Sequence, residues 1–328
     1  VFKRQGAAVI NLRCRQYHGF VIPNILDFIP VRSDSVYSLN SAEQALFAMQ
    51  NAAFQLSALS EHTGAAVEGI DLSEPVDEAT RRDLNQAFAE NSVLVIRNQT
   101  LTAQQFVGAV ENFGDIFQQH NTRFALPECP QIHYLSNKDH YEDGKRYIPG
   151  EGYHTDHSND AVPPKATVLL AVELPDKGGD TQYVNMHEAY EGLPDDMKER
   201  IADLKGIHVY QSKHSERKLM ALSPERQKQV AQTVVHPIVK THPVTGRKSL
   251  FINPIRIEEI IGMPDSEALP LLDELLAHAI QEKYQYRHKW QQGDLAMWDN
   301  RCLLHKANGD YDHDQTRYLY RVMLKDDA

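Results

Sequence analysis

Residues 150–183 read GEGYHTDHSNDAVPPKATVLLAVELPDKGGDTQY. The apolar run within this stretch, residues 166–174, is typical of a buried β-strand. Four side chains that can bind a metal directly precede it: His154, Asp156, His157 and Asp160. Potential metal ligands at the entrance to a buried strand predict a metal site that is built on a β-sheet.

Short strand-like segments continue on both sides of this stretch. They are residues 65–72, 92–99, 131–136, 180–185, 235–241, 248–253, 285–290, 293–298, 302–307 and 316–324. Helices are predicted at residues 77–91, 102–114, 193–206 and 265–283. Because strands and helices do not alternate regularly, a doubly wound sheet is disfavoured. The pattern predicts an α+β, mainly β chain with a closed or double-sheet core such as a jelly roll, and periodicity alone leaves other α+β arrangements open.

The composition is that of an ordinary globular protein. The 328 residues are 41% hydrophobic and 24% charged, with a net charge of -11. A negative net charge disfavours nucleic acids as partners, because their phosphates are attracted by a positive field. The odd count of three cysteines suggests no disulfide framework and predicts a reducing, cytoplasmic location. No apolar run has the length of a membrane span, so we expect no membrane partner.

The N-terminal segment differs from the rest of the chain. It begins with Val1, and residues 1–26 contain four basic and no acidic residues. Such a segment has features of a transit sequence, and it is equally compatible with residues outside the functional domain. We expect residues 1–48 to be an N-terminal extension and residues 49–328 to form a single domain, with Met49 near its natural start.

Two of the four potential ligands are placed to bind one ion. His154 and Asp156 are separated by one residue, so in a strand their side chains lie on the same face. Two histidines, one carboxylate and open coordination positions suit ferrous iron, whereas a closed set of cysteines suits structural zinc. His305, in GDLAMWDNRCLLHKANGDY, is the candidate third ligand. A His-x-Asp pair by itself often occurs by chance on a protein surface.

The last predicted strand, TRYLYRVML at residues 316–324, carries two arginines on one face. Arg317 and Arg321 alternate there with apolar residues, and burying a guanidinium is costly unless an anion meets it. At about 3.3 Å per residue the two lie roughly 13 Å apart, so they would serve two anions or two ends of one site. Alternatively, this is an edge strand with both arginines in solvent.

Five segments together resemble the taurine/2,4-dichlorophenoxyacetate dioxygenase family. They are YHTDHS (153–158), ELPDKGGDTQYVNMHEAYEGLP (173–194), THPVTGRKSLFIN (241–253), YQYRHKWQQGDLAMWDNRCLLHKA (284–307) and the Arg-x-x-x-Arg of the last strand. The resemblance spans residues 54–326 in the family's order. It implies a double-stranded β-helix with Fe(II) at its open end. It also implies a dioxygenase that uses O2 and 2-oxoglutarate to hydroxylate a small anionic substrate, with release of succinate and CO2.

The resemblance also implies individual residue roles. The implied iron ligands are His154, Asp156 and His305. Thr181 of the GGDT segment corresponds to the threonine that hydrogen-bonds 2-oxoglutarate, and Arg317 to the arginine that pairs with its distal carboxylate. Arg321 corresponds to an arginine near the anionic group of the substrate or near the cosubstrate. One extra residue between His305 and Arg317, relative to close relatives, leaves the division of roles between the two arginines open.

Substrate contacts are predicted from the positions that relatives use. The candidates are Gln119, His120, His157, Tyr210, Arg256 and Arg321. His157 is alternatively a polar residue at a strand end, and Arg256 a solvated loop arginine. We expect an anionic substrate because Arg321 would otherwise lack a partner. Phenoxyalkanoates, sulfonates and related acids meet this condition.

The resemblance further implies a homo-oligomer, either a dimer or a tetramer. Two other functions remain open. The first is a non-catalytic β-barrel protein of the same fold, which the intact ligand set disfavours. The second is a zinc hydrolase that uses the same three ligands and a metal-bound water. A hydrolase of that kind has no need for Thr181 and the paired arginines.

Overall fold

The computed structural model describes residues 53–119, 123–140, 144, 149–216, 219 and 233–326. The predicted extension at residues 1–48 and the predicted substrate residue His120 lie outside the described residues. The division of the chain at residue 48 therefore stays a prediction.

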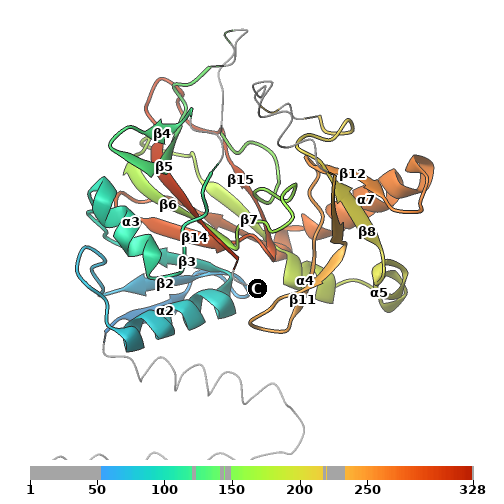
Figure 1. Cartoon of the computed structure of the whole chain (residues 1–328), viewed down its shortest axis with the longest axis horizontal. Coiled ribbons are helices and arrows are strands. Elements are labelled where there is room, and N and C mark those ends of the chain that lie inside the picture. Colours follow the sequence, from blue (N-terminus) through green and yellow to red (C-terminus); the bar gives the residue numbers. More distant parts are fainter. Residues whose placement is uncertain are drawn as a thin grey trace, which may run out of the picture. The chain divides into compact units, whose positions relative to one another are not determined.

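The largest sheet contains eight strands (Figure 1). In spatial order they are β1 (Gln55–Ala58), β2 (Ala65–Glu68), β3 (Val93–Ile96), β14 (Leu295–Asp299), β6 (Ala166–Glu173), β16 (Tyr318–Leu324), β5 (Cys129–Ser136) and β4 (Ala125–Leu126). Neighbouring strands are antiparallel except β2 and β3. Every residue of β3 and β14 is buried, which explains why their sequences are almost continuously apolar.

A second sheet of three strands packs against the first. Its spatial order is β13 (Gln285–His288), β7 (Thr181–Asn185) and β15 (Leu303–Ala307), and all neighbours are antiparallel. Trp298 and Leu319 of the large sheet share a buried cluster with Tyr183 and Leu303 of the small sheet. The two sheets therefore enclose a common core between their inner faces.

Two amphipathic helices cover the outer face of the large sheet (Figure 1). They are α2 (Glu78–Asn91) and α3 (Ala103–Glu111), and each is capped by the first residue of its predicted range, Asp77 for α2 and Thr102 for α3. The apolar faces of both helices pack on the sheet in one buried cluster, which includes Leu84 of α2. The sequence prediction of these two helices is confirmed.

A mixed layer covers the other face of the small sheet. Its elements are α4 (Met186–Glu191), α5 (Asp195–Ile201), β8 (Lys205–His208), β9 (Val234–Pro237), β10 (Val239–Thr241), β11 (Lys248–Leu250), β12 (Ile257–Ile260), α7 (Asp265–Ala279) and the 3₁₀ turn η1 (Glu282–Tyr284). Val184 and Leu304 of the small sheet share a buried cluster with Leu271 and Leu275 of α7. Figure 1 shows α7 and β12 beside β8 in this part of the molecule.

Several segments differ from their sequence predictions. The predicted helix 193–206 is shorter, since α5 ends at Ile201 and strand β8 begins at Lys205. The predicted strand 235–241 is divided into β9 and β10, because Pro237 has no N–H for the ladder and the Ile238 N–H donates to the Leu204 carbonyl (2.9 Å). The predicted strand 248–253 ends at Leu250. Helix α4 was not predicted, because its six residues are too few to show a helical period.

The described residues are mainly β with few helices, as the sequence predicts, and their strands form four separate open sheets. None of the helices in this part of the chain has the length and apolar character that a bilayer crossing requires.

Candidate metal centre

The two histidines of the predicted ligand set meet through a backbone bridge. The His154 N–H donates to the His305 carbonyl (3.0 Å), and the His305 N–H donates to the His154 carbonyl (2.8 Å). Their ring centroids are consequently 4.2 Å apart. Because His305 lies on β15, the small sheet carries one histidine directly and positions the other through this bridge.

Asp156 reaches the same place through a turn. Residues 156–159 form this turn, in which the Asp160 N–H donates to the His157 carbonyl (2.9 Å) and His157 has a φ of 49°. The prediction that His154 and Asp156 lie on one face of a regular strand was wrong, because the chain leaves extended geometry directly after the bridge. The turn nevertheless brings the carboxylate beside both imidazoles.

The ligand atoms of these three residues have the spacing of groups that share an ion. His154 Nε2 lies 3.8 Å from Asp156 Oδ1, and His305 Nε2 lies 3.8 Å from Asp156 Oδ2. Both distances are too long for a hydrogen bond. Two donors that each bind an ion at about 2.1 Å lie at most about 4.2 Å apart. All three residues are buried, so the fold holds them at these positions without direct bonds between them.

Hydrogen bonds and charge prepare the three side chains for a cation. The His154 Nδ1 is 2.9 Å from the Gly152 carbonyl, to which it donates, so the Nε2 lone pair is left for a metal. Burial by itself raises the pKa of Asp156. The neighbouring His305 and His154, followed by Arg321 and His157, outweigh burial and hold the pKa of this carboxyl well below its usual range. The site thus offers one carboxylate held in its anionic form beside two imidazole rings.

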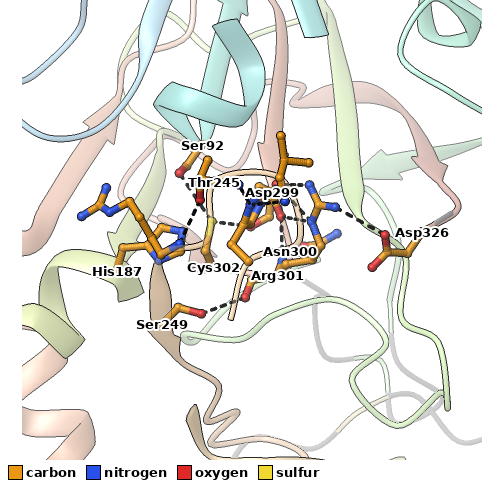
Figure 2. A network of polar contacts seen from close by, with 12 residues as sticks. Ser92, His187, Thr245, Ser249, Asp299, Asn300, Arg301, Cys302 and Asp326 are labelled. Atoms are coloured by element: carbon orange, nitrogen blue, oxygen red, sulfur yellow. Dashed lines mark hydrogen bonds and ion pairs between the residues drawn. The ribbon is translucent and has the colours of Figure 1, made fainter. Parts of the chain in front are cut away.

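A second buried cluster of His242, Asp299 and Cys302 has the same types of group but a different geometry (Figure 2). His242 Nε2 and Asp299 Oδ2 are 3.0 Å apart, within hydrogen-bond distance, and His242 Nδ1 accepts two backbone N–H groups of the β10–β11 turn. The Arg301 guanidinium binds both oxygens of Asp299 and extends toward Asp326. The His242, Arg301 and Asp299 groups already satisfy one another, so this cluster is a structural ion-pair network.

Another group of buried polar residues supports the turn that carries Asp156. The Asn253 Nδ2 donates to the Thr155 carbonyl (2.8 Å) and to Ser158 Oγ (2.9 Å). His208 Nδ1 is 2.9 Å from the same hydroxyl. His208 is fully buried, and burial, followed by the charges of His236, Lys240 and Arg256, lowers the pKa of His208 to about 3.

This buried histidine makes the protein sensitive to acid. The pKa of His208 is lower in the folded state than the ordinary value of 6.5, so its stabilisation is complete above pH 6.5 and is lost as the pH falls toward 3. We expect the unfolding free energy to decrease by about 2 kcal/mol between pH 6.5 and pH 5 on this account. Urea denaturation at pH 7 and pH 5 measures the loss. His208→Gln, which does not titrate, should reduce it, and an equal loss in both proteins would contradict this assignment.

Arg317 is a buried cation that forms no ion pair with any residue that the structure describes. Its side chain is 5% exposed, and its Nε donates to the Gly179 carbonyl (2.8 Å). Within the described residues no carboxylate forms an ion pair with it, because the nearby Asp180 pairs with Arg287 instead (2.7 Å). Burial lowers the pKa of Arg317. A guanidinium in this position calls for an external anion.

The Gly-Gly turn before β7 leaves room for this arginine. Gly179 has a φ of +69°, and a Cβ added there would lie 3.1 Å from Arg317 Cδ. Two residues later, Thr181 is buried and its Oγ1 accepts a hydrogen bond from Trp290 Nε1 (3.1 Å). Because the indole only donates, the Thr181 hydroxyl keeps its own proton for an acceptor. Sequence reasoning missed Trp290, which lies far from Thr181 in the chain.

Tyr183 adds a third polar group on the same face of β7. It pairs across the sheet with His305, so its side chain lies on the side of the metal ligands and of Thr181. Its hydroxyl is fully buried and has no hydrogen-bond partner among the described residues. Sequence reasoning missed this residue too, although its spacing of two from Thr181 was a signal. The buried cation, the hydroxyl proton and the orphaned phenol together fit a bound carboxylate.

The second arginine of β16 contacts a predicted substrate residue. Arg321 Nη2 donates to Gln119 Oε1 (2.6 Å), and Arg321 pairs across the sheet with His133 of β5. Burial, followed by the charges of Arg321 and His157, lowers the pKa of His133 to about 4. His133 was not predicted, and it adds a neutral imidazole beside the guanidinium.

The remaining predicted substrate residues fall into two places. His157 lies beside Phe117, with 5.5 Å between ring centroids, and its Nδ1 is 3.2 Å from Asp160 Oδ2. Arg256 and Tyr210 contact each other, since Arg256 Nη1 donates to the Tyr210 carbonyl (2.8 Å). Contact with a substrate stays a prediction for all of them.

Known proteins resemble this chain over almost all of its described length. The sequence profile of the taurine catabolism dioxygenase TauD, TfdA family matches residues 55–323. An alpha-ketoglutarate-dependent 2,4-dichlorophenoxyacetate dioxygenase of Cupriavidus pinatubonensis is 35% identical over 277 residues, which are 80% of this chain and 95% of the relative. An (S)-phenoxypropionate/alpha-ketoglutarate-dioxygenase of Sphingobium herbicidovorans is 32% identical over 284 residues, 84% of this chain and 96% of the relative.

Solved structures agree with the sequence matches. AAD-2, crystallised with Mn(II) and N-oxalylglycine, superposes with a TM-score of 0.71 at 28% identity, over 84% of this chain and 98% of that protein. A taurine dioxygenase from Burkholderia xenovorans superposes with a TM-score of 0.69 at 30% identity, over 84% and 92% of the two chains.

Proposed function

The chain belongs to the TauD, TfdA family of dioxygenases, and from this premise we propose that His154, Asp156 and His305 bind its Fe(II). It is a 2-oxoglutarate-dependent dioxygenase that uses Fe(II) and O2. One observation carries the assignment of the ligands. One ligand atom from each of these three buried side chains lies within 4.8 Å of the other two, and the contacts of Asp156 with the two histidines, at 3.8 Å, are too long for hydrogen bonds.

The residues around the metal ligands divide the work of binding. When bound, the iron would provide O2 activation, with 2-oxoglutarate as the co-reductant, for the oxidation of a substrate C–H bond. Arg317 pairs with the distal carboxylate of 2-oxoglutarate, and the Thr181 and Tyr183 hydroxyls donate to the same cosubstrate. Arg321 pairs with the acid group of the substrate. These contacts orient both molecules and exclude water from the reacting atoms.

The proposal includes a finer description of the fold. The eight-stranded and three-stranded sheets, which share one core, form the two halves of a double-stranded β-helix. The solved relatives support this description through their TM-scores of 0.71 and 0.69. The metal ligands lie where β15 and the bridge at His154 meet.

The substrate is a small organic acid. The two relatives named above act on 2,4-dichlorophenoxyacetate and (S)-phenoxypropionate. An alpha-ketoglutarate-dependent sulfate ester dioxygenase of Pseudomonas putida, 29% identical over 267 residues, acts on sulfate esters. An acid of this kind gives Arg321 a charged partner, and a dimer or tetramer is the expected assembly. The zinc hydrolase alternative leaves the buried Arg317 without an anion, which is why the dioxygenase is favoured.

A substrate panel tests the proposed function. The protein is incubated with Fe(II), ascorbate, O2 and 2-oxoglutarate, and succinate is measured with a phenoxyacetate, a phenoxypropionate, taurine or a sulfate ester. We expect at least one acid to stimulate succinate formation, and we expect a chelator or the exclusion of O2 to abolish it. Turnover supported by Zn(II) in place of Fe(II), or no succinate with any acid, would contradict the proposal.

A further inference from the structure

Thr167 and Asn300 are two buried residues next to the proposed metal ligand Asp156. We infer that Thr167 and Asn300 are positioning residues that occupy one carboxylate oxygen of Asp156 and thereby present the other oxygen to the metal. This inference rests on the proposed metal site. It concerns how Asp156 is held and does not add a ligand.

A chain of hydrogen bonds with one direction ends on Asp156. The Trp298 indole Nε1–H donates to Asn300 Oδ1 (3.1 Å), and Asn300 Nδ2 donates to Thr167 Oγ1 (2.9 Å). Thr167 Oγ1 then donates to Asp156 Oδ2 (2.7 Å). The indole is only a donor, so the orientation of the Asn300 amide is set, and the Thr167 hydroxyl must direct its single proton at the carboxylate. Thr167 and Asn300 are 0% and 2% exposed, so water does not compete for these groups.

The backbone of Asn300 is held as firmly as its side chain. Its N–H donates to the Lys165 carbonyl (2.8 Å), and its carbonyl accepts from Thr155 Oγ1 (2.8 Å). The neighbouring Asp299 is anchored by Arg301, as Figure 2 shows for the turn that contains Asn300. The turn between β14 and β15 is therefore a rigid support for the carboxylate, and it gives a function to the structural ion-pair network described above.

The hydrogen bond makes the two oxygens of Asp156 unequal. Oδ2 accepts the short bond from Thr167, whereas Oδ1 accepts no hydrogen bond within the described residues. In their distance to a histidine the two oxygens are alike, since Oδ1 lies 3.8 Å from His154 Nε2 and Oδ2 lies 3.8 Å from His305 Nε2. The proton of Thr167 already engages a lone pair of Oδ2, so Oδ1 is the oxygen whose lone pairs remain available to a metal. A carboxylate that binds through one oxygen leaves more open positions on the ion than a carboxylate that binds through two. The proposed function needs those positions for 2-oxoglutarate and O2.

The test compares metal binding in four proteins with full-length chains. Mn(II) is titrated into wild type, Thr167→Val, Thr167→Ser and Thr80→Val, and free Mn(II) is measured by electron paramagnetic resonance. Thr80→Val is the matched control, because the Thr80 hydroxyl also donates to a carboxylate, Asp77 Oδ2 (3.0 Å), far from the metal ligands in the chain. We expect Thr167→Val to raise the Kd for Mn(II) about 10- to 100-fold, and we expect Thr167→Ser and Thr80→Val to stay within about threefold of wild type.

A second readout separates positioning from general destabilisation. Under anaerobic conditions with Fe(II), 2-oxoglutarate should produce a visible absorption band, and Thr167→Val should need about 10-fold more 2-oxoglutarate for half of the full band. Thr80→Val should need the same 2-oxoglutarate concentration as wild type for half of the full band, even if its melting temperature falls.

Each outcome decides between the claims. If Thr167→Val is folded and binds Mn(II) and 2-oxoglutarate like wild type, the positioning role is wrong. If Thr167→Val does not fold, Thr167→Ala and Thr167→Ser provide a pair that differs only in the hydroxyl, and equal Kd values for this pair would likewise overturn the inference. If wild type itself does not bind Mn(II), the proposed metal site fails, and the inference fails with it for that separate reason.

Discussion

Replacement of Asp156 by alanine should lower the rate of succinate formation by more than about 100-fold while the protein remains folded. The loss of an outer partner of a metal ligand typically costs about 10- to 100-fold in affinity or activity, so loss of the ligand itself should exceed that range. Asp156 is the only anionic member of the set with His154 and His305, which makes it the main source of attraction for a divalent ion. Succinate release and Mn(II) binding measure the effect, and circular dichroism checks the fold.

A different buried carboxylate provides the control for this prediction. Asp294 is fully buried and pairs with Arg97 (2.7 Å) and His288 (3.1 Å). Asp294→Ala should lower the unfolding free energy by about 3–5 kcal/mol, because it leaves the partly buried Arg97 guanidinium and the buried His288 without their shared carboxylate. Its affinity for Mn(II) should remain within about threefold of wild type, since the ion pairs of Asp294 are with Arg97 and His288 and not with a proposed metal ligand. Full turnover in Asp156→Ala would remove Asp156 from the ligand set.

The convergence of His154, Asp156 and His305 could be inferred from the sequence, but its cause could not. The residue types and the family resemblance indicate which side chains meet. The spacing of His154 and Asp156 suggested a regular strand, whereas the structure has a bridge to His305 followed by a turn with a left-handed residue at His157. Over only three residues, a regular strand and a bridge followed by a turn show the same spacing of His154 and Asp156 in the sequence. The spacing therefore could not distinguish the two structures.

The hydrogen-bond partners of the site residues could not be predicted from the sequence for a related reason. The Trp290–Thr181 and Thr167–Asn300 hydrogen bonds join segments that lie more than a hundred residues apart in the chain. Local periodicity locates a strand but carries no information about its neighbours in the sheet. The same limit applies to the fold, in which β14 inserts between β3 and β6. The strongly apolar strands β6 and β14 were predictable to within a few residues, whereas β1, β4, β8 and β12 were not predicted. Strand order was not predictable.

Replacement of Arg317 by methionine should raise the KM for 2-oxoglutarate about 30- to 150-fold, which corresponds to the loss of about 2–3 kcal/mol of charge-assisted hydrogen bonding. The KM for the organic acid should change far less, because Arg321 and not Arg317 is assigned to that group. Methionine fills a similar volume without a charge. Because no described carboxylate pairs with Arg317, the substitution breaks no ion pair there and removes the hydrogen bond to the Gly179 carbonyl. Initial rates of succinate formation at varied 2-oxoglutarate and at varied substrate separate the two constants.

The thermal stability of the same variant gives an independent check. In wild type, 2-oxoglutarate with Mn(II) should raise the melting temperature, because a ligand that binds only the folded state stabilises it. Arg317→Met should lose most of this shift, and without ligand its melting temperature should equal or exceed that of wild type, since a buried and uncompensated charge has been removed. Arg321→Met is the matched variant on the same strand and should instead raise the KM for the organic acid. If Arg317→Met impairs the organic acid and Arg321→Met impairs 2-oxoglutarate, the roles of the two arginines are exchanged, with β16 bulged between Tyr318 and Leu319 as the structural reason.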